Sequence, residues 1–238
     1  MTGPRRAMVM AAGRGTRMGE LTRTTPKPLL KACGRPLIDR ALDRAQEAGI
    51  EEAVVNVHHL ADRLEAHLSR RATPRIVISD EREALLETGG GVRKALPLLG
   101  EAPALVLNSD AVWTGAAPVP ALVSAWDEAR MDALLLLVPR TRARAYTRPG
   151  DFFAGEDGRP RRRGDAATAP LVYTGAQIIR PGVFAEGPDG AFSTNLIWDR
   201  LLVRGRLFAV VHDGDWVDVG TPAGLAEAEA AIAEEPGA

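Results

Sequence analysis

Glycines and cations gather near the start of the chain in an order that suits phosphate groups. The segment is Ala11-Ala12-Gly13-Arg14-Gly15-Thr16-Arg17-Met18, followed by Thr25-Pro26-Lys27-Pro28-Leu29. Gly13 and Gly15 lack side chains, so backbone N–H groups beside them can approach oxyanions. Arg14 and Arg17 add guanidinium groups that can each hold a phosphate through two hydrogen bonds. Lys27 stands in extended chain between two prolines and acts as a point charge. This order predicts a site for nucleotide phosphates.

The spacing of the glycines excludes two common phosphate loops. A dinucleotide-binding G-x-G-x-x-G loop would need glycine at position 18, which is Met18. A P-loop would need lysine after Gly19, where Glu20 stands. The pattern therefore disfavours a nicotinamide-dependent oxidoreductase and a P-loop ATPase. For the glycines alone, a tight surface loop with solvated arginines stays an alternative.

Two aspartates are candidates for a metal site. Asp110 comes just after the apolar run 104–108, so we expect it at the carboxyl edge of a parallel sheet. Asp218 alternates with Val217 and Val219, which places its side chain on the face opposite the valines. Mg²⁺ prefers one or two carboxylates together with phosphate oxygens and water. As an alternative, each aspartate is a turn or helix-cap residue, although Thr221 is the better cap for the terminal helix.

The paired glycine and proline-lysine-proline motifs resemble the signature of the sugar-1-phosphate nucleotidylyltransferases. Further matches, at residues 86–91, 108–113 and 216–221, resemble the branch of that family that acts on N-acetylmuramate α-1-phosphate in cell-wall recycling. The resemblance spans about residues 7–231. It implies that a sugar-phosphate oxygen attacks the α-phosphorus of UTP, and pyrophosphate leaves. Because that phosphate is already largely ionised at neutral pH, catalysis would consist of positioning and charge neutralisation.

The resemblance also implies a role for individual residues. Arg17 would hold the β- and γ-phosphates, and Lys27 the α-phosphate or the incoming sugar phosphate. Asp110 and Asp218 would bind Mg²⁺. The nucleotide would lie against Ala11, Ala12, Gly13, Gly15, Thr16 and Gly89. The sugar would contact Asp151, Gly175 and Asn195.

The choice of base and sugar is less specific in the sequence. Relatives often carry a glutamine a few residues before the glycine at position 89, where this chain has Ala84 and Leu85. The same chemistry on another pair therefore stays open, such as mannose 1-phosphate with GTP, or glucose 1-phosphate with UTP or dTTP. A non-catalytic subunit that binds a nucleotide sugar is a third possibility, which the retained cations and aspartates disfavour.

Composition limits the partners of the chain. The 238 residues carry a formal net charge of -1, so no global field attracts nucleic acid or an anionic membrane. Cys33 is the single cysteine, which excludes an intrachain disulfide and is consistent with a reducing cytoplasm. No apolar run approaches the roughly 20 residues that span a bilayer. We expect a cytoplasmic protein without a membrane segment, whose oligomeric state the sequence leaves open.

Apolar runs alternate with helical patterns in the first 140 residues. Strands are expected at residues 53–57, 75–78, 104–108 and 133–138, and helices at residues 37–48, 60–68 and 92–99. The three glycines 89–91 are expected to precede the last of these helices. Strand and helix in alternation predict βαβ crossovers. The fold class is therefore α/β, a Rossmann-like three-layer α/β/α arrangement around a mostly parallel mixed sheet of the nucleotide-diphospho-sugar transferase type.

The later part of the chain is less regular. We expect one domain over residues 1–238, with a part rich in hairpins and loops around residues 140–200 that binds the sugar. Strands are expected at residues 171–179 and 206–211, and a terminal helix begins at Thr221-Pro222. The stretch 155–164 is predicted to be a surface hairpin or mobile loop. Its arginines are expected to be solvated, with contact to phosphate or a partner as the alternative: Arg159, Arg161, Arg162 and Arg163.

Overall fold

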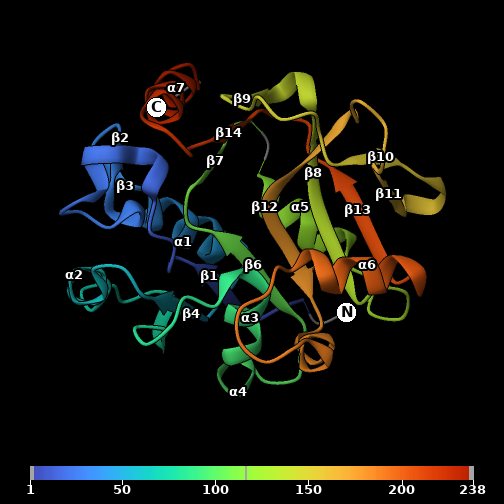
Figure 1. The fold of residues 1–238 in the computed structure, drawn as a ribbon, viewed down its shortest axis with the longest axis horizontal. Helices are drawn as coiled ribbons and strands as arrows, with labels where there is room; N and C mark the ends of the chain where they lie inside the picture. Colours follow the sequence, from blue (N-terminus) through green and yellow to red (C-terminus); the bar gives the residue numbers. More distant parts are fainter. Residues whose placement is uncertain (1–2, 116, 236–238) are drawn as a thin grey trace.

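A nine-stranded mixed sheet forms the centre of the molecule (Figure 1). The computed structural model describes residues 3–115 and 117–235. The strands of the sheet are β1 (Arg6–Met10), β4 (Glu52–Val57), β5 (Arg75–Asp80), β6 (Ala104–Asn108), β8 (Ala133–Pro139), β10 (Phe152–Ala154), β11 (Pro160–Arg162), β12 (Leu171–Ile179) and β13 (Leu207–Val211). Strand β1 runs parallel to β4 and β6, whereas β12 runs antiparallel to β6 and β8. The predicted mixed sheet is confirmed.

Helices cover both faces of this sheet. They are α1 (Leu37–Glu47), α2 (Ala61–Leu68), α3 (Glu87–Lys94), α4 (Leu96–Leu99), α5 (Pro118–Ala125) and α6 (Asn195–Val203), whereas α7 (Pro222–Ala233) packs elsewhere. One core lies between the sheet and α1, α2 and α5, and a second lies between the sheet and α3, α4 and α6. In β1, Val9 faces the first core and Met8 the second. The central strands are continuous apolar runs because both of their faces are buried.

Smaller elements pack around one end of the sheet. Strands β7 (Ala111–Trp113), β14 (Trp216–Asp218) and β9 (Ala143–Arg144) form a three-stranded sheet, and β2 (Lys31–Ala32) pairs with β3 (Arg35–Pro36). Helix α7 packs against them in a third apolar cluster. The hydroxyl of Thr221 accepts the N–H of Gly224 at 3.1 Å, so the predicted cap of this helix is confirmed. Within the described residues, no helix is long and apolar enough to span a membrane.

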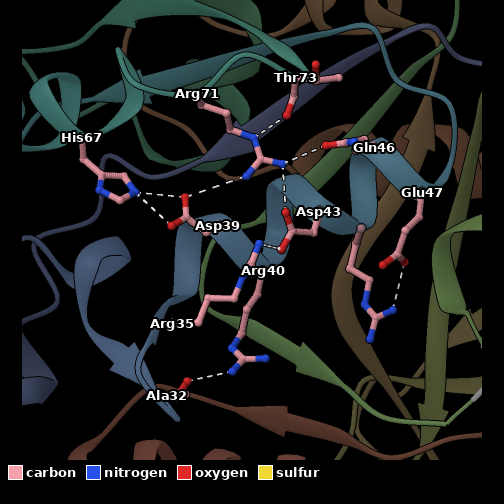
Figure 2. Close-up of polar contacts among 11 residues, drawn as sticks. Ala32, Arg35, Asp39, Arg40, Asp43, Gln46, Glu47, His67, Arg71 and Thr73 are labelled. Atoms are coloured by element: carbon pink, nitrogen blue, oxygen red, sulfur yellow. Dashed lines mark hydrogen bonds and ion pairs between the residues drawn. The ribbon is translucent and has the colours of Figure 1, made fainter. Parts of the chain in front are cut away.

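The outer face of α1 is tied to its neighbours by polar contacts (Figure 2). His67 Nε2 on α2 lies 2.9 Å from a carboxylate oxygen of Asp39. Arg71 donates to Asp43 at 2.9 Å, and Arg40 donates to the carbonyl of Ala32 at 2.7 Å. Partly exposed contacts of this kind contribute about 0.2–1 kcal/mol each. They hold α1 against α2 and the hairpin β2–β3, which follows the proline-lysine-proline segment.

The prediction that the three glycines precede a helix is wrong. They lie inside α3, which begins at Glu87, and α4 follows as a separate short helix. A Cβ at position 90 would come 2.3 Å from the carbonyl oxygen of Gly190, and one at position 91 would come 2.9 Å from Glu81 Oε1. These close approaches require glycine, so tertiary packing outweighs the low helix propensity of this residue.

Candidate active site

Two adjoining pockets open where β1 and β6 end. The first, here called the loop pocket, has a volume of about 230 Å³. It is lined by Met10, Ala11, Gly13, Gly15, Thr16, Arg17, Lys27, Pro28, Ser109, Asp110 and Gly220. The second, here called the aromatic pocket, has a volume of about 330 Å³ and includes Tyr173, Trp198 and Trp216. Met10, Arg17 and Asp110 line both, so one group of side chains faces the two spaces.

The glycine loop begins at the peptide group between Met10 and Ala11, and hydrogen bonds hold this group through both its N–H and its carbonyl. The N–H of Ala11 donates to Asn56 Oδ1 at 2.6 Å. On the other side, the carbonyl of Met10 accepts the backbone N–H of Ser109 at 3.2 Å and its hydroxyl at 2.8 Å. The two partners, Asn56 and Ser109, lie at the ends of β4 and β6, the strands on either side of β1. The loop therefore leaves the sheet in a direction set by the core.

A buried carboxylate orients the Asn56 side chain. Glu81, fully buried, accepts Asn56 Nδ2 at 2.7 Å on one oxygen and the N–H of Leu86 at 3.3 Å on the other. Because the carboxylate can only accept a hydrogen bond from the amide nitrogen, Asn56 must direct its oxygen toward Ala11. Burial raises the pKa of Glu81, and the bond from Asn56 opposes that rise. Glu81 thus links the glycine loop to the chain that leads into α3.

Lys27 and Asp110 form an ion pair at the wall shared by the two pockets. Lys27 is only 9% exposed, so the aspartate compensates a cation that is largely removed from water. Gly15 has a φ of 63°, and a Cβ there would lie 3.0 Å from Lys27 Cβ. The glycine is therefore required both by its left-handed backbone and by the lysine that passes beside it.

Arg17 extends between the two pockets. A Cβ at position 220 would lie 2.8 Å from both terminal nitrogens of its guanidinium, so Gly220 makes room for this side chain. Arg17 itself is exposed and accessible to an anion in either pocket. Its position is suited to binding phosphate groups that lie across the shared wall.

Asp218 lies next to Asp110 through strand pairing. In the antiparallel pair β7–β14, Asp218 is opposite Ala111, the residue after Asp110. Arg148 Nη2 lies 3.5 Å from Asp218 Oδ2. Among residues 3–115 and 117–235, no three His, Cys, Asp or Glu side chains group to hold a metal ion. Two carboxylates in one pocket fit Mg²⁺, which takes its other ligands from phosphate and water.

The three residues predicted to contact the sugar meet in the aromatic pocket, together with Arg17 and both aspartates. One oxygen of Asp151 accepts the N–H of Tyr173 at 2.9 Å. Gly175 has a φ of 85°, and a Cβ there would come 2.8 Å from Asn108 Nδ2. Asn195 is the first residue of α6. Side chains far apart in the sequence thus surround one space, as a binding site requires.

Two predicted nucleotide residues stand apart from the pocket walls. Ala12 is buried directly after Ala11 and is not among the residues that line either pocket. Gly89 lies inside α3, where its N–H donates to the carbonyl of Phe192 at 2.8 Å. A contact between the base and this N–H stays a prediction, and it would require the bond to Phe192 to open.

Sequence reasoning missed several residues of the site. Arg148 and Arg162 line the aromatic pocket, although the second was expected in a solvated loop. Instead it lies on β11, where Arg161 and Arg162 alternate across the strand. Because adjacent residues here are all arginine, the sequence alone does not show which of them faces the pocket. Asn56 was detectable, as a polar residue within an apolar strand.

Comparison with known proteins agrees with this geometry. The chain matches the MobA-like NTP transferase domain family over residues 7–234. It belongs to that family, and the predicted relationship to the sugar-1-phosphate nucleotidylyltransferases is confirmed.

Two curated relatives cover almost the whole chain. The chain is 48% identical to the N-acetylmuramate alpha-1-phosphate uridylyltransferase of Caulobacter vibrioides, over 97% of this chain and 98% of that protein. It is 36% identical to the enzyme of the same name from Neisseria meningitidis serogroup B, over 94% and 97% of the two chains. The crystal structure of a UDP-glucose pyrophosphorylase complexed with UDP-glucose superposes with a TM-score of 0.81 at 20% identity, over 97% of this chain and 99% of that one. This likeness confirms the predicted fold class.

Proposed function

We propose that this chain transfers a uridylyl group from UTP to N-acetylmuramate α-1-phosphate, giving UDP-N-acetylmuramate and pyrophosphate in cytoplasmic cell-wall recycling. One observation carries the proposal: Arg17 and Asp110 line both the loop pocket and the aromatic pocket. A phosphate chain in one space and a sugar phosphate in the other would meet at these side chains. The 48% identity to a uridylyltransferase of that name supports the choice of base and sugar.

The side chains would act by position and charge. Arg17 binds the β- and γ-phosphates, and Lys27 binds the α-phosphate or the incoming sugar phosphate. The sugar phosphate needs no strong general base, because its second pKa is about 6. Holding it in line with the α-phosphorus and neutralising the charge that develops accounts for the acceleration. The fixed peptide group at Ala11 keeps the loop in place without rearrangement during the reaction.

Asp110 and Asp218 are the residues that would hold Mg²⁺. When bound, the ion supplies positive charge beside the phosphate oxygens. The two aspartates are oriented by cations of this chain, since Lys27 pairs with Asp110 and Arg148 lies beside Asp218. If Asp110 holds the ion, Lys27 would be available to a phosphate in place of its aspartate partner. Lys27 and Asp110 would then each still have a partner of opposite charge.

The remaining assignments follow the two pockets. The nucleotide would lie against the segment that contains Ala11, Ala12, Gly13, Gly15 and Thr16. Gly89 would contact the base after the bond to Phe192 opens. Asp151, Gly175 and Asn195 would contact the sugar, in the part of the chain around residues 140–200.

The test is pyrophosphate release by the purified chain with Mg²⁺. UTP, dTTP, GTP, CTP and ATP are crossed with the 1-phosphates of N-acetylmuramate, N-acetylglucosamine, glucose and mannose. We expect turnover with UTP and N-acetylmuramate 1-phosphate. Preference for another pair would retain the mechanism and overturn the substrate assignment. No turnover with any pair, together with binding of a nucleotide sugar, would support the non-catalytic subunit instead.

A further inference from the structure

The arginines of the hairpin β10–β11 make different contacts. Arg159 stacks on Phe208 and donates to the carbonyl of Gly205, and Arg163 donates to the carbonyl of Ala166 at 2.6 Å. Arg161 stacks on Phe153, with its guanidinium carbon 4.4 Å from the ring centroid. Of the four, Arg162 is the one whose side chain lines the aromatic pocket. Its neighbour Arg161 faces the opposite side of the strand.

The guanidinium of Arg162 is held firmly in the pocket wall. Its carbon lies 4.9 Å from the ring centroid of Phe152 and 5.4 Å from that of Trp198. Nε and Nη2 lie 2.9 and 2.8 Å from Asp199 Oδ1, and Nη2 also donates to the carbonyl of Asn195 at 3.3 Å. Among the described residues, these bonds use Nε and Nη2 and leave both Nη1 hydrogens available. A side chain fixed in this way loses little freedom when it binds an anion.

Arg162 lies on different elements from the other two arginines of the aromatic pocket. Arg17 lies at the wall shared with the loop pocket, and Arg148 lies beside Asp218. Arg162 instead lies on the side formed by β11 and α6, close to Asp151. In the antiparallel pair β10–β11 it is opposite Phe152, the residue after Asp151. The pocket thus holds a third cation where the sugar ring, rather than its phosphate, would lie.

A sugar that carries its own carboxylate suits this third cation. N-acetylmuramate bears a lactyl carboxylate, whereas N-acetylglucosamine, glucose and mannose are neutral apart from the phosphate. We propose that Arg162 is a specificity residue that binds the sugar-borne carboxylate, with Asp199 as its positioning residue. The inference rests on the proposed nucleotidyl transfer and adds how an acidic sugar is chosen.

The size of the effect follows from the bond type. A guanidinium and a carboxylate form charge-assisted hydrogen bonds, which are about twice as strong as neutral ones. Loss of such a contact corresponds to about a 10- to 100-fold change in kcat/KM. A neutral sugar offers Arg162 only hydroxyl and amide oxygens, whose hydrogen bonds to it are weaker. The ratio of kcat/KM for the acidic sugar to that for the neutral sugar therefore reports on the contact between Arg162 and the carboxylate.

The experiment compares two substrates that differ in the lactyl group. The ratio of kcat/KM for N-acetylmuramate 1-phosphate to that for N-acetylglucosamine 1-phosphate is measured with UTP and Mg²⁺. The variants are Arg162→Gln, Arg162→Lys and Asp199→Asn, and Arg161→Gln on the other face of the same strand is the matched control. We expect the ratio to fall about 10- to 100-fold in Arg162→Gln, mainly through KM. It falls less in Arg162→Lys, which retains the positive charge but not the fixed guanidinium, and stays unchanged in Arg161→Gln.

Thermal unfolding of each variant separates specificity from folding. If Arg162→Gln fails to fold, the lysine variant and Asp199→Asn give the answer, since both retain a positive charge at position 162. Equal losses for the two sugars, or an unchanged ratio, would overturn the proposal. If the wild-type chain turns over neither sugar phosphate, its binding of UDP-N-acetylmuramate against UDP-N-acetylglucosamine is measured by calorimetry. An Arg162-dependent preference for the acidic product then supports the inference although the proposed function has failed, and equal binding overturns it.

Discussion

Replacement of Asn56 by leucine removes the connection between the glycine loop and Glu81. The buried N–H of Ala11 loses its acceptor, which costs about 1–3 kcal/mol, and the Glu81 carboxylate loses a hydrogen bond worth about 1.5–3 kcal/mol. Together, Asn56→Leu should lower the free energy of unfolding by about 2.5–6 kcal/mol. Domains are typically stable by about 5–15 kcal/mol, so a loss in the lower part of this range leaves the variant folded at 25 °C.

The coupling between the two side chains is measured by a double-mutant cycle in urea unfolding. Once Asn56 is leucine, Glu81→Leu removes a poorly compensated buried carboxylate and should cost less than in the wild type. We expect a coupling energy of about 1.5–3 kcal/mol between the two positions. UTP binding by calorimetry should weaken in Asn56→Leu, because the loop that receives the phosphates is no longer fixed. If the losses of unfolding free energy in the two single variants add up to the loss in the double variant, the proposed orientation of Asn56 by Glu81 is refuted.

The carboxyl group of Glu81 should also make the stability of the chain depend on pH. Burial raises the pKa of Glu81 above its ordinary value of 4.5. Between 4.5 and the raised pKa, the folded chain binds more protons than the unfolded chain, so this group's contribution to stability falls as pH rises. The stability difference between the wild type and Glu81→Leu should therefore shrink as pH rises from 4.5 toward 7. A difference that grows with pH would mean that the bonds from Asn56 and Leu86 dominate over burial.

Three further outcomes are expected at other positions. Asp110→Asn and Asp218→Asn should each lower pyrophosphate release by at least about 100-fold with an unchanged circular dichroism spectrum, and near-normal rates in both would contradict the Mg²⁺ assignment. Arg17→Gln should lower kcat/KM by a factor that corresponds to a loss of about 2.7–4 kcal/mol of transition-state stabilisation. An effect confined to the binding of the sugar phosphate would contradict the role of Arg17 in binding the triphosphate. Burial lowers the pKa of His212 from 6.5, so wild-type stability should fall as pH drops below 6.5. His212→Gln should remove that dependence in urea unfolding, unless the histidine titrates normally.

The strands of the central sheet could be predicted because they are buried on both faces. Runs such as 53–57 and 133–138 consist almost entirely of apolar residues, and the structure confirms them as β4 and β8. The strands β7 and β9 were missed, since two or three residues show no periodicity, whereas the alternation of Val217, Asp218 and Val219 agrees with β14. Helices α5 and α6 also went unpredicted. Their positions depend on packing against the sheet more than on local pattern.

The candidate site was predictable to the extent that its residues belong to motifs. The glycine loop, Lys27 and the two aspartates could be named from spacing, and they lie around the two adjoining pockets. Arg162 and Glu81 could not, because their contacts arise from strand pairing and from burial. Gly89 shows the opposite case. It belongs to a motif, yet its N–H is bonded to Phe192 and not directed to a pocket.

The two pockets depend on different parts of the fold. The loop pocket is held by Asn56 and Ser109 at the ends of parallel strands in the core, where a change disturbs several strands at once. The wall of the aromatic pocket near Arg162 is built on the short hairpin β10–β11, which pairs with β12 at the edge of the sheet, and on α6. A substitution there alters a stacked arginine without moving the strand ends. If Arg162 binds the sugar carboxylate as proposed, its substitution should therefore change sugar preference while the glycine loop keeps its position.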